Sequence, residues 1–170
     1  MKKLLVLCMM FLGAVGLEAQ NITGSWVTIL EENGANVAVL FGFDDNSNSI
    51  MKTIFEIHDQ DMGVINLELT VEGTYQVNGK KLKLNPDKKT AEVSIGDVEW
   101  TEQMKAKFKK NPDLEKSTRK ILKDKFEEQK AAFVDELVSE TDMTIVSVSS
   151  TDLVLKSEDD VMRFKRFNAN

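Results

Sequence analysis

The residues that could do chemistry are few, and their spacing does not suit catalysis. The one histidine, His58, stands beside Asp59 and Asp61. A transition-metal site needs more nitrogen or sulfur ligands than this chain offers, so we interpret His58 as a surface residue. Adjacent carboxylates such as Glu127 and Glu128 do not converge on one substrate atom, and no Ser-His-Asp spacing, phosphate loop or nucleotide fingerprint appears. We therefore predict a non-enzymatic protein with no catalytic residues, metal site or cofactor.

A second candidate site has the oxygen spacing of a calcium-binding loop. Asp44, Asn46 and Asn48 stand at alternate positions, as the first ligands of such a loop do. However, Ser49 occupies the position that requires glycine, and Phe55 stands where a glutamate should complete the loop. We interpret this segment as a hairpin turn.

Length and composition favour one folded domain that binds or supports other molecules. The chain has 170 residues, of which 42% are hydrophobic and 29% are charged, so it can bury a core. Its net charge of -6 argues against a protein that holds nucleic acid by neutralising phosphates.

The first residues have the layout of a secretory signal peptide. Two lysines precede an apolar stretch at 4–16, and Ala19 provides a small residue for cleavage. We predict that 1–19 is removed and that 20–170 is a single exported domain, periplasmic or secreted, with no transmembrane segment. Lipidation of Cys8 is not favoured, because a leucine precedes it and the apolar run before it is short.

After the predicted signal peptide, the chain has regions in which apolar residues recur with two different spacings. From 22 to 98 apolar and polar residues alternate, as in Ile65 to Val71, and Asn78-Gly79 is typical of a two-residue hairpin turn. The same alternation resumes at 143–167. Closely spaced strands with short turns predict an antiparallel meander rather than βαβ units.

Between these regions, about 101–140 has a helical period. Asn111-Pro112 predicts a helix start, with asparagine as the cap and proline at the first helical position. The helix should carry an apolar stripe, made by Leu114, Ile121, Leu122, Phe126, Phe133, Leu137 and Val138. Lysines dominate its first half. The stripe must be covered, either by the barrel's own outer wall or mouth, or by a partner for which the helices act as a docking surface or mobile lid.

Three motifs resemble the secreted bacterial lipocalin-like (calycin) proteins. Gly24-Ser25-Trp26 matches the Gly-x-Trp of a first lipocalin strand, residues 75–84 look like a mid-barrel hairpin, and the last strand carries Arg166. The resemblance covers residues 22–98 and 142–168. It implies a mainly β fold, an antiparallel up-and-down lipocalin-like β-barrel with an inserted two-helix segment near the C-terminal strands.

The resemblance also implies how one end of the barrel is closed. Gly24 and Trp26 would begin the first strand, with the indole as a plug. Arg166 of the last strand would stack on this ring and hydrogen-bond to nearby carbonyls, with Arg163 as the second choice. We expect these residues to be structural.

A barrel of this size either holds one small apolar ligand or fills itself with side chains. The candidates for ligand contact are large inward-facing side chains: Phe41, Phe43, Phe55, Ile57, Leu67, Leu69 and Tyr75. Tyr75 stands out because its hydroxyl needs a polar partner inside the barrel. Two functions follow: binding of a small hydrophobic ligand, or a cell-envelope interaction module whose helices dock on a partner protein while the barrel is filled.

Overall fold

The computed structural model describes residues 21–32, 35–137, 141–158 and 160–167. The expected signal peptide, 1–19, lies outside these residues. In chain order the described elements are β1 (Gly24–Glu32), β2 (Ala35–Phe43), β3 (Asn48–Asp59), β4 (Gly63–Asn78), β5 (Lys81–Pro86), the short 3-10 helix η1 (Lys88–Thr90), β6 (Glu92–Trp100), α1 (Glu102–Lys110), α2 (Pro112–Leu137), β7 (Asp142–Val148), β8 (Asp152–Ser157) and β9 (Asp160–Arg166).

Eight of the nine strands in the described residues form a closed antiparallel ring, in the order β1-β2-β3-β4-β5-β7-β8-β9 and back to β1. This ring confirms the predicted fold class, a mainly β antiparallel barrel with two helices inserted before its last three strands. The predicted hairpin joins β4 to β5, but its two turn residues are Gly79 and Lys80 rather than Asn78 and Gly79, because Asn78 still pairs with Lys81 and Gly79 has a φ of +59°. The segment from Asp44 to Asn48 forms the expected turn between β2 and β3.

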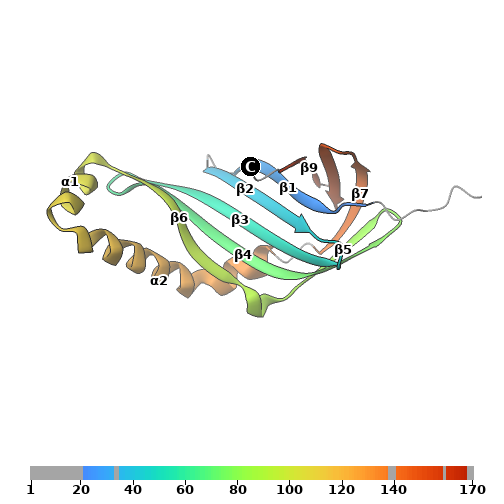
Figure 1. Cartoon of the computed structure of the whole chain (residues 1–170), viewed down its shortest axis with the longest axis horizontal. Helices are drawn as coiled ribbons and strands as arrows, with labels where there is room; N and C mark the ends of the chain where they lie inside the picture. Colours follow the sequence, from blue (N-terminus) through green and yellow to red (C-terminus); the bar gives the residue numbers. More distant parts are fainter. Residues whose placement is uncertain (1–20, 33–34, 138–140, 159, 168–170) are drawn as a thin grey trace, which may run out of the picture.

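Part of the sheet continues beyond the closed barrel. β4 changes partner along its 16 residues: Gly63–Thr70 pairs with β6, and Gly73–Asn78 pairs with β5. The β1–β9 pairing covers Trp26 and Val27, whereas the β1–β2 pairing continues to Glu32. The extension of β1, β2, β3, β4 and β6 away from the barrel is called the open sheet below (Figure 1).

The two helices cover the inner face of the open sheet, which continues the barrel interior. α1 lies at the end of the molecule farthest from the barrel, and α2 runs from there along the sheet (Figure 1). The hydroxyl of Thr101 accepts a hydrogen bond from the Met104 amide at the start of α1. α2 begins at Pro112, as the Asn111-Pro112 pair predicts.

The stripe of α2 is covered within the protein, as one of the two alternatives predicts, but α2 packs on the inner face of the open sheet and not on the outer wall of the barrel. The physical reason is polarity. The outer face carries charged cross-strand pairs such as Lys52 and Glu68, 2.7 Å apart, whereas the inner face is apolar.

Across the described ranges, no helix is long and apolar enough to span a membrane.

The apolar stripe of α2 is also narrower than the sequence predicts. Leu122, Phe126 and Phe133 pack against the sheet, but Ile121 is 56% exposed and Leu114 is 36% exposed. An α-helix turns about 100° per residue, so Ile121 points well away from the surface that Leu122 contacts. Val138 lies outside the described residues.

Candidate functional site

A tryptophan and an arginine close one end of the barrel. Trp26 is fully buried, and its indole Nε1 donates a hydrogen bond to the carbonyl of Ile22 at 2.8 Å. Arg166 lies directly opposite Trp26 in the β1–β9 pairing. Its guanidinium carbon is 4.3 Å from the centre of the indole ring, within the range of a cation–π contact. Arg163 is exposed.

The same guanidinium explains the glycine of the Gly-x-Trp motif. Arg166 donates from Nε to the carbonyl of Ser150 at 2.7 Å, and from Nη1 to the carbonyl of Thr23 at 3.3 Å. Gly24 has a φ of +126°, and a Cβ at this position would lie 2.3 Å from Arg166 Nη1. Gly24 therefore provides both a backbone conformation and the space that the arginine occupies.

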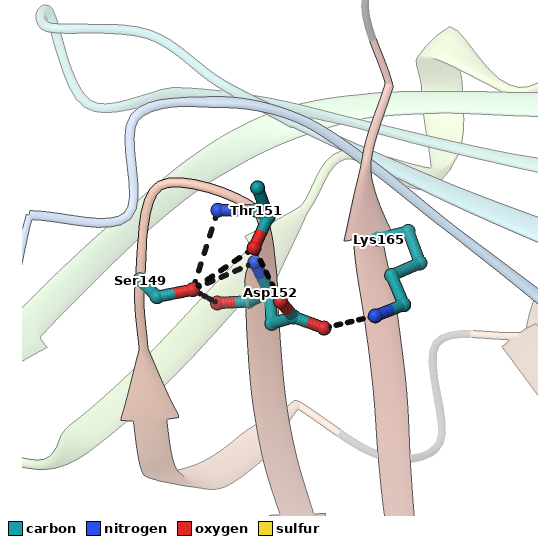
Figure 2. A network of polar contacts seen from close by, with 4 residues as sticks. All are labelled: Ser149, Thr151, Asp152 and Lys165. Atoms are coloured by element: carbon teal, nitrogen blue, oxygen red, sulfur yellow. Dashed lines mark hydrogen bonds and ion pairs between the residues drawn. The ribbon is translucent and has the colours of Figure 1, made fainter.

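The β7–β8 turn holds the carbonyl that Arg166 binds. Figure 2 shows the polar network of this turn, in which the Ser149 hydroxyl accepts hydrogen bonds from the amides of Thr151 and Asp152. The Asp152 carboxylate accepts from Lys165, the residue opposite it on β9. Hydrogen bonds from Lys165 and then Thr151 lower the pKa of Asp152. The network fixes the geometry of an exposed turn.

Two of the candidate ligand contacts lie in the core of the closed barrel. Phe41 is packed against Phe164, with ring centres 5.2 Å apart, and Phe43 against Tyr75 at 4.8 Å. The Tyr75 hydroxyl donates a hydrogen bond to the carbonyl of Asp44 at 2.8 Å. Tyr75 therefore already has the polar partner that its hydroxyl requires.

The Asp44 carboxylate has partners within its own turn. It accepts hydrogen bonds from the amides of Asn46 and Asn48 and from the Asn48 side chain. The side-chain and backbone hydrogen bonds of Asn48 are the main causes that lower the pKa of Asp44. No group of three His, Cys, Asp or Glu side chains placed to hold a metal ion occurs among the residues that the structure describes.

The remaining candidates face α2 rather than the closed barrel. Leu67 and Leu69 are buried on the inner face of β4, and Phe55 and Ile57 are partly exposed on β3. The Phe55 ring lies 5.6 Å from the ring of Phe133 on α2. We call this contact zone the helix–sheet layer. It comprises Phe55, Ile57, Leu67, Leu69, Val71, Val93 and Ile95 of the sheet with Phe126, Phe133, Val134 and Leu137 of α2.

One polar side chain is buried where the barrel core meets this layer. Thr53 is 3% exposed, and its hydroxyl has no hydrogen-bond partner among the described residues. The register places Thr53 opposite Val39 on β2 and opposite Leu69 on β4. Thr53 is not among the residues that the sequence predicts to contact a ligand. The available signal was a hydroxyl at an inward position between Met51 and Phe55.

The first half of α2 is fastened to the sheet by polar contacts. Glu115 accepts hydrogen bonds from the Trp100 indole at 3.0 Å and from Arg119 at 3.2 Å. Arg119 also donates to the Gly96 carbonyl of β6 at 3.2 Å. The hydrogen bond from Trp100, followed by that from Arg119, lowers the pKa of Glu115.

The second half of α2 borders a small hollow. It measures about 270 Å³ and lies between η1 and α2. Its apolar lining includes Ala91, Ala131 and Val134. Val134 belongs to the helix–sheet layer, and Ala91 packs against it. Lys88 and Asp135 form an ion pair at its rim, with Nζ and Oδ1 2.6 Å apart and side chains 59% and 68% exposed.

A larger hollow of about 590 Å³ lies at the rim of the closed barrel end, lined partly by Gly24, Phe43, Asp44 and Ile50. It is separate from the helix–sheet layer.

Comparison with models of known protein families gives no match, and comparison with curated protein sequences gives none either.

Proposed function

We propose that this protein is an exported, non-enzymatic, lipocalin-like binding protein for a small hydrophobic molecule, which lies in the helix–sheet layer. The observation that carries this proposal is the cover on the inner face of the open sheet. That face is closed by an amphipathic helix instead of a further β-wall. A ligand can take the place of helix side chains there without breaking a strand ladder.

The two halves of α2 are held differently, which supports a gating role for the second half. The first half makes the hydrogen bonds of Glu115 and Arg119. The second half contacts the sheet through apolar side chains and the exposed pair of Lys88 and Asp135. An exposed ion pair stabilises by about 1 kcal/mol or less, so ligand contacts can offset its loss.

This location differs from the one expected for a simple lipocalin-like barrel. Phe41 and Phe43 make the core of the closed end together with Trp26 and Phe164. The partly exposed pair Phe55 and Ile57 lies outside that core, beside α2. The ligand would therefore sit beyond the closed barrel.

The test is titration of the protein with N-phenyl-1-naphthylamine, an uncharged probe whose fluorescence rises in apolar surroundings. Phe133→Ala removes the ring that covers Phe55 and leaves a cavity, so this variant should bind the probe about tenfold more tightly than the wild type. Ile121→Ala is the matched control, because Ile121 lies on the same helix but is 56% exposed, so this truncation leaves no cavity and the affinity for the probe should not change. Circular dichroism verifies that both variants are folded. Equal affinity of wild type and Phe133→Ala would contradict the proposed location.

One observation favours the second candidate function, a cell-envelope interaction module. Several lysines of α1 and α2 are exposed and form no ion pair with a carboxylate of the described residues: Lys107, Lys109, Lys110, Lys116, Lys120, Lys123 and Lys125. They offer a basic surface to an acidic partner protein. If the wild type and both variants leave the probe in water, the docking function becomes the better account.

A further inference from the structure

The Thr53 hydroxyl is buried and has no hydrogen-bond partner among the described residues, and such burial is costly in a folded protein. A buried polar group that loses water without gaining a hydrogen bond destabilises the fold, and a valine of nearly the same shape would avoid the penalty. Thr53 is 3% exposed, and its hydroxyl meets no partner in the part of the chain that the structure describes. A ligand with a hydrogen-bonding group would provide the partner.

The strand register places this hydroxyl at the inner end of a row of buried apolar side chains under α2. Thr53 is opposite Leu69, and Leu69 is opposite Val93 on β6. Strands are spaced about 4.8 Å apart, so Thr53 lies about 10 Å across the sheet from Val93. The hollow lined by Ala91 and Val134 lies at the β6 side of this row. An aliphatic chain entering there could cross Val93 and Leu69 and bring its end to Thr53.

The surroundings of Thr53 favour an uncharged group. Its neighbours on the inner face are Met51 and Phe55 along β3, and Val39 and Leu69 across it. None of these side chains can neutralise a charge, and an unpaired carboxylate in such a place is strongly disfavoured. The charged side chains occur instead at the solvent-facing rim of the hollow, where Lys88 and Lys130 pair with Asp135 and Glu127.

We propose that Thr53 is a specificity-determining residue of the helix–sheet layer, and that its hydroxyl binds the uncharged polar head, an alcohol or carbonyl, of an aliphatic ligand about ten carbons long. The buried, unpartnered hydroxyl and the apolar row from Thr53 to Val93 carry this inference. It rests on the proposed function, because it assigns the polar end of the same ligand.

The test is displacement of N-phenyl-1-naphthylamine by decan-1-ol and by decanoate at pH 8. Thr53→Val should bind decan-1-ol about tenfold more weakly than the wild type, since it loses one hydrogen bond, while its affinity for the probe stays the same. Thr53→Ser, which keeps a hydroxyl, should bind decan-1-ol within about threefold of the wild type. Decanoate should bind Thr53→Val and the wild type equally, because its charged head stays at the rim of the hollow.

Thr28→Val is the matched control. Thr28 faces inward on β1 opposite Val39, in the same row as Thr53, but is partly exposed to solvent. This variant should leave the affinity for decan-1-ol unchanged. Equal affinity of Thr53→Val and the wild type for decan-1-ol would overturn the role of Thr53, and a loss of decanoate affinity in Thr53→Val would overturn the preference for an uncharged head. Failure of the wild type to bind even the probe would instead overturn the proposed function.

Discussion

The guanidinium of Arg119 on α2 lies 5.5 Å from the centre of the Trp100 ring on β6, a contact of the same kind as that of Arg166 on β9 with Trp26 on β1. Both pairs combine ring contact with hydrogen bonds to backbone carbonyls. The two pairs have different structural tasks. One closes the barrel where β1 meets β9, and the other fastens α2 to β6.

The Trp100 cluster predicts a specific loss of stability in acid. The folded-state pKa of Glu115 is lowered, chiefly by the Trp100 indole, so its contribution is present above the unfolded pKa and disappears as the pH falls through the folded pKa. Unfolding in urea should show stability decreasing below about pH 4, and Glu115→Gln should reduce the slope of that decrease.

The control for this prediction is Glu128→Gln, because Glu128 is an exposed residue of the same helix. It should leave the pH dependence as in the wild type. A Glu115→Gln variant with the wild-type slope would show that the cluster does not depend on the charge of Glu115.

The contact between Gly24 and Arg166 predicts non-additive mutations. Gly24→Ala places a Cβ against the guanidinium and forces a positive φ on alanine, so it should destabilise the protein by about 2–4 kcal/mol in chemical denaturation. In an Arg166→Ala background the steric conflict is gone, and the same change should cost about 1–2 kcal/mol, the backbone term alone. Identical costs in both backgrounds would refute the steric explanation.

Thr53→Val should stabilise the ligand-free protein. Removing a buried, unpartnered hydroxyl is expected to raise the free energy of unfolding by about 1–2 kcal/mol. Thr90→Val is a useful contrast, since the Thr90 hydroxyl makes hydrogen bonds to the backbone of Glu72 and Asp87 and its loss should destabilise. A destabilising Thr53→Val would indicate that the hydroxyl has a partner in solution.

The sequence carries enough information to predict the barrel and the closure of its end, for physical reasons. Apolar and polar residues alternate along β3 and β4, and this pattern indicates strands with one buried face and one exposed face. Trp26 and Arg166 lie on the first and last strands, and the pairing of these two strands closes the barrel. Both features can be recognised in short stretches of sequence, and both restrict how the strands can be arranged.

The helix–sheet layer could not be predicted in the same way. Its existence depends on β4 pairing with β6 along one half and with β5 along the other, which is a long-range choice without a local signature. The sequence pattern predicts only that Phe55 and Leu67 face the inside of a barrel. Nothing in the sequence predicts that Phe133 packs over them. The roles of Glu115 and Arg119 depend on the same packing, because their partners Trp100 and Gly96 come from β6.

Export predicts a defined new N-terminus. Expression of the full chain in a bacterium should yield an extracytoplasmic protein that begins at Gln20, because Ala19 is the expected cleavage residue. Intact mass and N-terminal sequencing would identify the bond. Protein that stays in the cytoplasm with 1–19 attached would contradict export.

The most direct measurement is the set of nuclear Overhauser effects between bound decan-1-ol and protein protons. We expect contacts from the alkyl chain to Leu69, Val93 and Phe133, with the carbon next to the hydroxyl close to Thr53. Contacts confined to Ile50 and Phe43 at the opposite hollow, or no contacts at saturating alcohol, would contradict a ligand site between α2 and the open sheet.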